Sequence, residues 1–342
     1  MTNKKYTLDL AEFYITNVCN LTCTNCNRFN NLKLKGFQKW HEYKDKYKKF
    51  ADRIDIKRVS IIGGEPFLNP DIYNWIDGLI ELWPNSDTFV TTNGTRPNDE
   101  KLLQTLMKHK GKLWIDYECH DANYYNTYHN NVLKFLPNCT YKIFWDLEKW
   151  ADRYPSMRGS DWPLEPIDIT DEANWDWLNK ELKEIGGELS SFQFRIEYYI
   201  DDIKYAMVAP AWYFNSTAIK MKGDAMYTEA TSNMNIAHDT CTMSKCHNFV
   251  DGELYKCILP YSLEEAIKQD DISISPEDYD MLKSYKPLTA EHSDNEFKKF
   301  IDNIENPIDQ CKFCPEYYTT EKISIVKKNS KIANEKFSTC SG

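Results

Sequence analysis

Three cysteines near the N-terminus, Cys19, Cys23 and Cys26, are spaced closely enough to bind one metal centre, with three and then two residues between them. An iron–sulfur cube has four irons, so three thiolates leave one iron open to a small molecule. A structural zinc site normally has all four positions closed by protein ligands. The open position therefore favours chemistry over scaffolding. A zinc knuckle and three core cysteines are the alternatives.

This Cys-x3-Cys-x2-Cys spacing, which opens with Cys19-Asn20-Leu21, resembles the radical S-adenosylmethionine (radical SAM) superfamily. The resemblance implies a [4Fe–4S] cluster whose open iron binds S-adenosylmethionine (SAM) through its amino and carboxylate groups. It also implies that an electron cleaves SAM to a 5'-deoxyadenosyl radical, which abstracts hydrogen from a substrate. Asn25 stands where the family usually has an aromatic residue. We therefore expect Asn25 to contact adenine through the backbone, without stacking.

A second motif, Gly63-Gly64-Glu65-Pro66, resembles the Gly-Gly-Glu-Pro sequence of the same family. Glycine permits close backbone approach at the end of a strand. Neighbouring backbone groups and the Glu65 carboxylate can then hold the ammonium group of methionine. Alone, this sequence is often only a tight turn. Its place one β-α-β unit after the cysteines favours SAM binding.

Polar residues also end the next two expected strands. Thr92 and Asn93 resemble the strand end that lies beside the ribose and substrate in this family, although Asn93-Gly94 is equally a turn signal. Asp116 stands where a SAM-contacting residue is common, and it could bind ribose hydroxyls or simply be solvated. Cys119 could return a hydrogen atom to a substrate radical, but a cysteine in a strand is more often a small buried hydrophobe.

A second group of cysteines lies in about the last hundred residues. Cys246, Gly252 and Cys257 resemble the opening of the SPASM/twitch extension of radical SAM enzymes, with a shorter gap before the glycine than the family has. Cys311-x2-Cys314 would complete four thiolates for an auxiliary [4Fe–4S] cluster. The stretch 315–322 has no cysteine, which favours the shorter twitch form. A structural zinc ribbon is the alternative, and Cys241 and Cys340 are spare or alternative ligands.

Strand and helix patterns alternate along the first two thirds of the chain. The expected strands are 8–15, 57–62, 87–92, 113–118, 140–145 and 192–200. The expected helices are 40–54, 70–82, 98–108, 123–135 and 175–185. This alternation predicts a parallel α/β sheet, and its six units match the partial (β/α)6 TIM-like barrel that the resemblance implies.

Two domains follow from these patterns. Residues 1–238 form the expected radical SAM core, with an inserted loop at about 147–173 that contains three prolines. Residues 239–342 form the expected small cysteine-rich domain, with a hairpin at 248–255 and helices at 276–284 and 295–304.

Composition limits the location and the partners. The chain has 342 residues, eleven cysteines and a net charge of -10. An odd number of cysteines at metal-ligand spacings, without an export signal, predicts reduced thiols in the cytoplasm. No apolar run reaches the roughly 20 residues of a membrane span, and the acidic balance argues against a nucleic-acid partner.

The resemblance implies an oxygen-sensitive enzyme that takes electrons from a donor such as flavodoxin or ferredoxin. We expect it to modify a peptide or protein side chain. The alternative enzyme is a small-molecule dehydrogenase acting on a sugar or an aminocyclitol. An alternative of another class is a zinc-binding interaction protein on a degenerate barrel.

Overall fold

The computed structural model describes residues 5–23, 26–96, 99–118, 125–145, 167–168, 194–201, 203–209, 218–222, 224–241, 243–316 and 325–327. The chain divides into two compact units. The first contains residues 1–90 and 213–342, and the second contains residues 91–212.

The first unit is built on a sheet that is parallel at its centre, with the order β15–β13–β12–β1–β3–β4. β1 pairs in parallel with both β3 and β12, and β3 pairs in parallel with β4. β13 is antiparallel to both of its neighbours. The strands are β1 (Tyr6–Tyr14), β3 (Ile54–Ile62), β4 (Asp87–Thr92), β12 (His247–Val250), β13 (Glu253–Tyr255) and β15 (Leu288–Thr289). The parallel prediction is confirmed for the three N-terminal strands.

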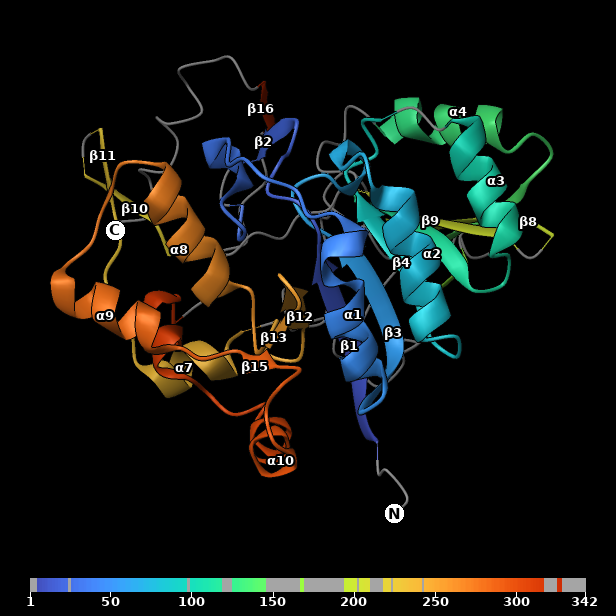
Figure 1. Cartoon of the computed structure of the whole chain (residues 1–342). Helices are drawn as coiled ribbons and strands as arrows, with labels where there is room; N and C mark the ends of the chain where they lie inside the picture. The colour runs from blue at the N-terminus through green and yellow to red at the C-terminus, as the bar shows by residue number, and fades with distance from the viewer. Residues whose placement is uncertain are drawn as a thin grey trace, which may run out of the picture. The chain divides into compact units, whose positions relative to one another are not determined.

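Helices α1 (Trp40–Ala51) and α2 (Ile72–Leu82) pack against β3 (Figure 1). The predicted aromatic stripe faces the core, where Tyr47 and Phe50 are fully buried. The Tyr47 ring lies edge-on to Phe13 at 5.3 Å and to Phe249 at 5.7 Å. Burying each such side chain contributes about 1.5–3 kcal/mol, so this core fixes β1 and β12 as neighbours in the sheet.

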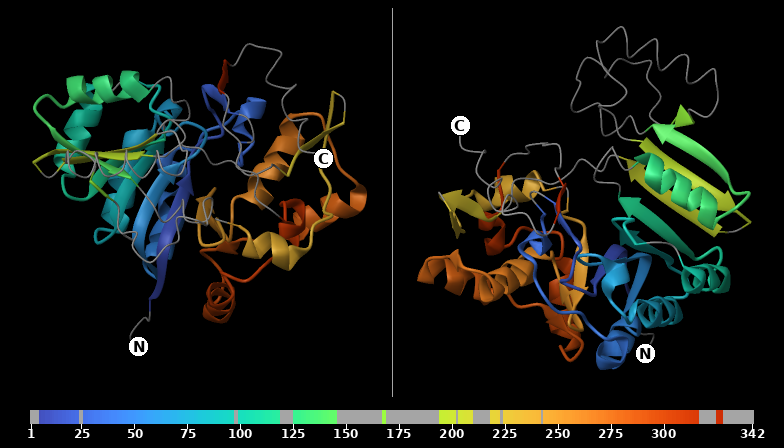
Figure 2. Two further views of the ribbon diagram at one scale, coloured as in Figure 1. Left: turned by 180° about the vertical axis from the view of Figure 1, so that it is seen from behind. Right: turned by 90° about the horizontal axis from the view of Figure 1, so that it is seen from above.

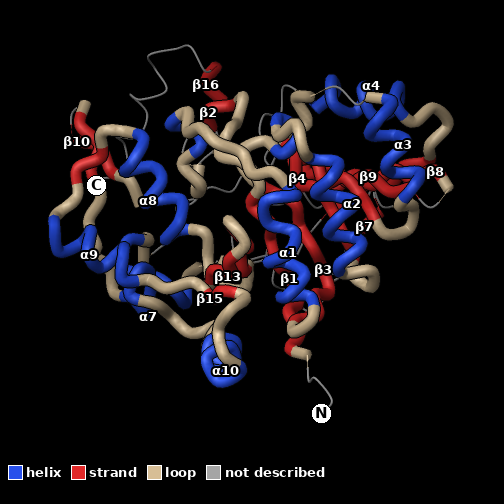
Figure 3. The backbone as a smooth tube through the Cα atoms, in the orientation of Figure 1, coloured by secondary structure: helices blue, strands red, loops and turns tan. Residues whose placement is uncertain are grey.

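The C-terminal part of the first unit is mostly helical (Figure 3). Its elements are β10 (Lys220–Lys222), β11 (Ala225–Tyr227), α7 (Met234–Asp239), α8 (Leu259–Gln269), β14 (Ile272–Ser273), α9 (Pro276–Ser284), α10 (Asp294–Asp302) and a 3-10 helix η6 (Asp309–Phe313). The predicted helices at 276–284 and 295–304 are therefore present within two residues. Helix α8 carries no clear sequence signal and was not predicted.

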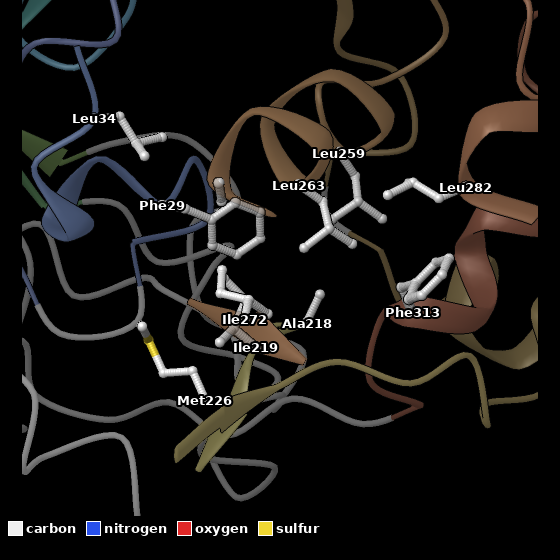
Figure 4. Close-up of a cluster of buried hydrophobic side chains, with 11 residues drawn as sticks. Phe29, Leu34, Ala218, Ile219, Met226, Leu259, Leu263, Ile272, Leu282 and Phe313 are labelled. Atoms are coloured by element: carbon white, nitrogen blue, oxygen red, sulfur yellow. The ribbon is translucent and has the colours of Figure 1, made fainter. Parts of the chain in front are cut away.

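A hydrophobic cluster joins the N-terminal cysteine loop to this helical part (Figure 4). Phe29 and Leu34 come from the loop, whereas Leu263 comes from α8 and Phe313 from η6. Lys35 also donates its backbone N–H to the Gln269 side chain at 2.8 Å. The segment after Cys26 is thus held by the C-terminal elements.

The second unit has the strand order β5–β9–β8–β6–β7, and helix α4 (Tyr125–Phe135) lies across its strands (Figure 2). The strands are β5 (Leu113–Glu118), β6 (Thr140–Trp145), β7 (Ile167–Asp168), β8 (Phe194–Ile200) and β9 (Ile203–Ala209). Only the β5–β9 pair is parallel, and the other described pairs in this unit are antiparallel.

The sixth strand of the predicted barrel is therefore wrong in direction, because β8 runs antiparallel to both β6 and β9. β6, the predicted fifth strand, keeps the direction of β5 but pairs antiparallel with β8, with Thr140 opposite Tyr199. The missed feature is the tight turn after Ile200, where Asp201 has a φ of 49°. That turn starts a hairpin and sends the chain back as β9, which no pattern predicted.

Three other predictions have mixed outcomes. The helix predicted at 98–108 is α3 (Glu100–Lys108), which Asp99 caps by accepting the Leu102 N–H at 2.8 Å. Asn98, the helix predicted at 175–185 and nearly all of the inserted loop lie outside the described residues. In the described part of the chain, no helix is both long enough and apolar enough to cross a bilayer.

Candidate functional site

The N-terminal cysteine loop leaves the end of β1 and is fixed at its base by backbone hydrogen bonds. Asn17 donates its N–H to the Gly36 carbonyl at 2.8 Å, and Gln38 donates to the Ile15 carbonyl at 2.9 Å. These bonds close residues 18–35 into a loop, so the three cysteines start from a fixed backbone. β2 (Leu21–Cys23) lies within this loop.

The glycine motif packs directly on the base of this loop. The Gly64 N–H bonds the Thr16 carbonyl and the Glu65 N–H bonds the Val18 carbonyl, both at 2.8 Å. A side chain at Gly64 would place its Cβ 2.4 Å from the Val18 oxygen and 3.0 Å from the Cys19 Cβ. Only glycine fits this close approach. The two predicted motifs therefore meet, as we expect of one site.

Glu65 is completely buried. Its Oε1 accepts the Phe67 N–H at 3.0 Å and so caps the short helix η2 (Pro66–Leu68). At Gly63, a Cβ would lie 2.6 Å from the Thr16 carbonyl oxygen. The motif thus serves first as a rigid backbone corner, and the Glu65 carboxylate has a structural partner that the sequence did not predict.

Cys19 and Cys23 are buried and Cys26 is half-buried. The Cys19 sulfur accepts the Leu21 N–H at 3.5 Å. Burial raises the pKa of the Tyr14 phenol, and the charges of Cys26 and Cys19 act in the same direction. Both thiols therefore lie near one buried hydroxyl, which accepts a hydrogen bond from the Asn30 amide at 2.9 Å.

A buried ion pair stands close to the loop. The Arg28 Nη2 lies 2.6 Å from the Glu12 Oε2, and the two side chains are 9% and 8% exposed. Burial raises the pKa of Cys246 to about 12, with the Glu12 charge raising it further and Arg28 opposing. Cys246 therefore lies beside this ion pair.

The C-terminal thiols that face one another are Cys241, Cys257, Cys311 and Cys314. Burial raises the pKa of Cys257 to about 12, and the charges of Cys311 and Cys241 act in the same direction. Burial also raises the pKa of Cys314 well above its usual value. The charges of Cys257, Cys241 and Cys311 raise it further. The charge of Cys241 also raises the pKa of Cys246. Cys241 is therefore a fifth candidate ligand beside the four predicted ones, Cys246, Cys257, Cys311 and Cys314.

Local structure explains why Cys241 joins this group. Cys241 follows α7, which packs against η6, where Cys311 lies. Ser232 donates its N–H to the Lys312 carbonyl at 3.1 Å and ties the two segments together. The signal was present in the sequence: ten residues separate Cys241 from Gly252, against five from Cys246. Counting from Cys241 gives the longer gap that the resemblance requires.

A buried lysine was also missed. Lys256 is 8% exposed and immediately precedes Cys257. Burial lowers the pKa of Lys256 to about 8, while the negative charges of Cys311, Cys257 and Glu305 raise it. A cation is therefore held against the C-terminal thiols.

Among the described residues, no three His, Cys, Asp or Glu side chains are already arranged to hold a metal ion. The donor types nevertheless fit iron–sulfur centres, which thiolates bind. Three cysteines on one fixed loop suit a cluster with an open iron. The C-terminal cysteines supply the four thiolates that a fully ligated cluster needs.

The remaining predicted residues belong to the second unit or lie outside the described chain. Thr92 and Asn93 are buried, and the Asn93 Oδ1 accepts the Thr95 N–H at 3.0 Å, as in a turn. Asp116 is half-buried on β5. Asn25 and Cys119 lie outside the described residues.

Residues 13–154 match the model of the Radical SAM superfamily. A probable GTP 3',8-cyclase of Pyrococcus horikoshii is 36% identical over 81 residues, which are 24% of this chain and 25% of the cyclase. SuiB of Streptococcus suis bound to S-adenosylmethionine aligns at a TM-score of 0.27 with 22% identity, over 35% of this chain and 25% of SuiB. BtrN in complex with AdoMet and 2-DOIA aligns at 0.38 with 13% identity, over 94% and 100% of the two chains. The matches to the cyclase and to SuiB thus span a quarter of each relative.

Proposed function

Because residues 13–154 match the model of the Radical SAM superfamily, we propose that this protein cleaves S-adenosylmethionine reductively and abstracts hydrogen from a substrate. When bound at Cys19, Cys23 and Cys26, a [4Fe–4S] cluster would supply the electron for that cleavage. The three thiolates hold the cluster and leave one iron for the amino and carboxylate groups of SAM.

One observation carries the proposal: the glycine motif and the cysteine loop are hydrogen-bonded to each other. The bonds from Gly64 and Glu65 reach Thr16 and Val18, directly before Cys19. A ligand of the open iron would therefore meet the Gly63–Glu65 backbone. In this proposal Asn25, Thr92, Asn93 and Asp116 contact the rest of SAM, and Cys119 is a candidate hydrogen donor.

We further propose that residues 239–342 are a twitch-like extension that holds a second [4Fe–4S] cluster. Its ligands are Cys241, Cys257, Cys311 and Cys314, because these thiols lie close enough to raise one another's pKa. Lys256 supports the assignment, since a buried cation offsets the negative charge of four thiolates.

The proposed substrate is a peptide or protein side chain, and the proposed reductant is a flavodoxin or ferredoxin in a reducing cytoplasm. A deuterated substrate that loses its hydrogen to the 5'-deoxyadenosyl radical transfers the label to 5'-deoxyadenosine. Peptides and aminocyclitols deuterated at carbon would therefore be compared by mass spectrometry of that product. If deuterium reached 5'-deoxyadenosine only from aminocyclitols, the protein would be a small-molecule dehydrogenase and the peptide proposal would be wrong.

Anaerobic reconstitution with iron and sulfide tests the proposed function. We expect iron for two cubes, and 5'-deoxyadenosine after addition of SAM and dithionite. Replacing Cys19, Cys23 and Cys26 by Ala should abolish the product. Protein that binds zinc and no iron would instead identify an interaction module.

The ligand choice at the second site has a matched pair of variants. Cys241→Ala should lose the C-terminal iron, whereas Cys246→Ala should keep it, because α7 packs against η6, which carries Cys311, and Cys241 follows α7 directly. The reverse pattern would restore Cys246 as the ligand.

A further inference from the structure

A continuous row of four tyrosine rings crosses the first unit. Tyr14 and Tyr261 have ring centroids 5.9 Å apart, Tyr261 and Tyr255 are 6.1 Å apart, and Tyr255 and Tyr285 are 5.6 Å apart. These separations are those of directly packed aromatic rings. The members come from β1, α8, β13 and the residue after α9.

The row packs on an apolar cluster of its own. Tyr14 belongs to it with Ile62, Val250 and Ile258, and Tyr255 and Tyr261 pack against it. Tyr14 is 1% exposed. The centre of the row is therefore shielded from water along with its apolar neighbours.

The row ends at the two cysteine groups. At one end, the Tyr14 hydroxyl accepts the Asn30 amide N–H at 2.9 Å, and Asn30 belongs to the loop that carries Cys19, Cys23 and Cys26. At the other end, the Tyr285 hydroxyl accepts the Lys256 N–H at 2.7 Å, one residue before Cys257. Few packings of four tyrosines would place both ends beside thiols that are more than two hundred residues apart in the sequence.

We propose that this tyrosine row is the route along which single electrons pass between the C-terminal thiol site and the N-terminal cysteine loop. Electron tunnelling falls off faster across gaps than through atoms in contact, and these rings form an unbroken row of contacts between the two cysteine groups. The proposal rests on the function proposed above, because both cysteine groups must hold clusters.

The electron balance is simple. One electron leaves the C-terminal cluster, which undergoes a one-electron oxidation. It arrives at the N-terminal cluster, which undergoes a one-electron reduction. No bond forms or breaks. Iron–sulfur clusters work at potentials too low to oxidise a neutral phenol. The tyrosines are therefore the medium and keep their protons.

The test measures electron redistribution in the reconstituted holoenzyme. A flash-activated deazaflavin delivers less than one electron per protein, and freeze-quenched samples are followed by electron paramagnetic resonance. Tyr255→Leu and Tyr261→Leu should slow redistribution between the two cluster signals several-fold. Tyr255→Phe and Tyr261→Phe should keep the wild-type rate, because they keep the ring. The reduction potential of each cluster should stay unchanged in all four.

Two further variants guard against misfolding. Tyr285→Leu alters a half-buried ring at the end of the row, and it should also slow redistribution. Tyr279→Leu, on the neighbouring α9 but outside the row, is the matched control and should not.

Wild-type rates in folded leucine variants would overturn the route alone, and 5'-deoxyadenosine formation would be untouched. Protein without iron at the C-terminal thiols would overturn the route together with the auxiliary cluster. These two failures are distinguished by iron content.

Discussion

Gly64 is the residue at which the two N-terminal motifs come into contact. Its backbone N–H bonds Thr16, and its missing side chain leaves room for Val18 and Cys19. Because Val18 contributes a backbone oxygen to this contact, no side-chain rotation can relieve an added methyl group. The position therefore controls the geometry of the first cysteine.

Gly64→Ala should lower the free energy of unfolding by about 1–3 kcal/mol through overpacking, and it should also reduce the N-terminal iron per folded protein. Iron analysis after size-exclusion chromatography measures this loss. Gly78→Ala is the control, because its Cβ would overlap the Trp40 ring, away from the cysteine loop. Equal iron loss in both variants would mean that only global stability matters.

The Glu12–Arg28 pair gives a second prediction for single residues. Arg28→Met leaves the buried Glu12 carboxylate without its ion-pair partner, so we expect a loss of about 3–5 kcal/mol in unfolding free energy. Chemical denaturation would measure it. The double variant Glu12→Leu/Arg28→Met should recover most of that loss. No recovery would show that Arg28 stabilises the loop by other contacts.

At the scale of elements, the β12–β13 hairpin positions Cys257 and Lys256. Its turn uses Asp251 and Gly252 with φ values of 53° and 77°, and the Gly252 N–H donates to the Tyr47 hydroxyl at 3.1 Å. The turn is thus anchored to α1. Any change at Gly252 should reach the C-terminal thiols through β13.

Gly252→Ala should cost about 1–2 kcal/mol, because the left-handed backbone is strained for an L-residue. The Lys46 side chain that the new methyl would meet is flexible and can move. Thermal unfolding would measure the cost. Gly252→Asn should cost less, since asparagine tolerates this conformation. If Gly252→Ala and Gly252→Asn lost equal unfolding free energy, the loss would come from the contact with Lys46 and not from backbone strain.

Helix α4 and strand β8 are joined by a histidine. The His129 Nδ1 lies 2.7 Å from the Tyr198 hydroxyl, and burial lowers the pKa of His129. The unfolded histidine, with a pKa of about 6.5, therefore takes up a proton first as the pH falls. This contribution to stability is complete above that pH and is lost as the pH falls toward the lowered pKa.

The free energy of unfolding should thus decrease as the pH falls below about 6.5 toward the lowered pKa of His129. Urea titrations of the wild type and His129→Asn would isolate the effect. The variant should have a smaller pH slope. Parallel slopes would assign the decrease to other groups.

At the scale of the whole molecule, the sequence predicted what depends on local periodicity and spacing. The stripe of Trp40, Tyr47 and Phe50 gave α1, and the glycine motif was placed correctly against the cysteine loop. The reversed direction of β8 could not be predicted, because it depends on one tight turn between the similar strands β8 and β9. Strand periodicity is identical in parallel and antiparallel pairs.

The site divides in the same way. Cys19, Cys23 and Cys26 are adjacent in sequence and could be identified by spacing alone. For Cys241 the sequence offered only the longer gap before Gly252, and its place near Cys311 depends on the packing of α7 on η6, which joins segments about seventy residues apart. The tyrosine row is likewise a tertiary feature, drawn from four elements with no common sequence signal.

The account depends on an iron at the N-terminal loop that binds SAM directly. Electron–nuclear double resonance of the reduced, reconstituted protein with SAM labelled with 15N and 17O in its methionine part tests this. We predict hyperfine coupling from both labels, and none in the Cys19, Cys23 and Cys26 alanine variant. A reduced cluster at these cysteines with no coupling to either label would contradict the account.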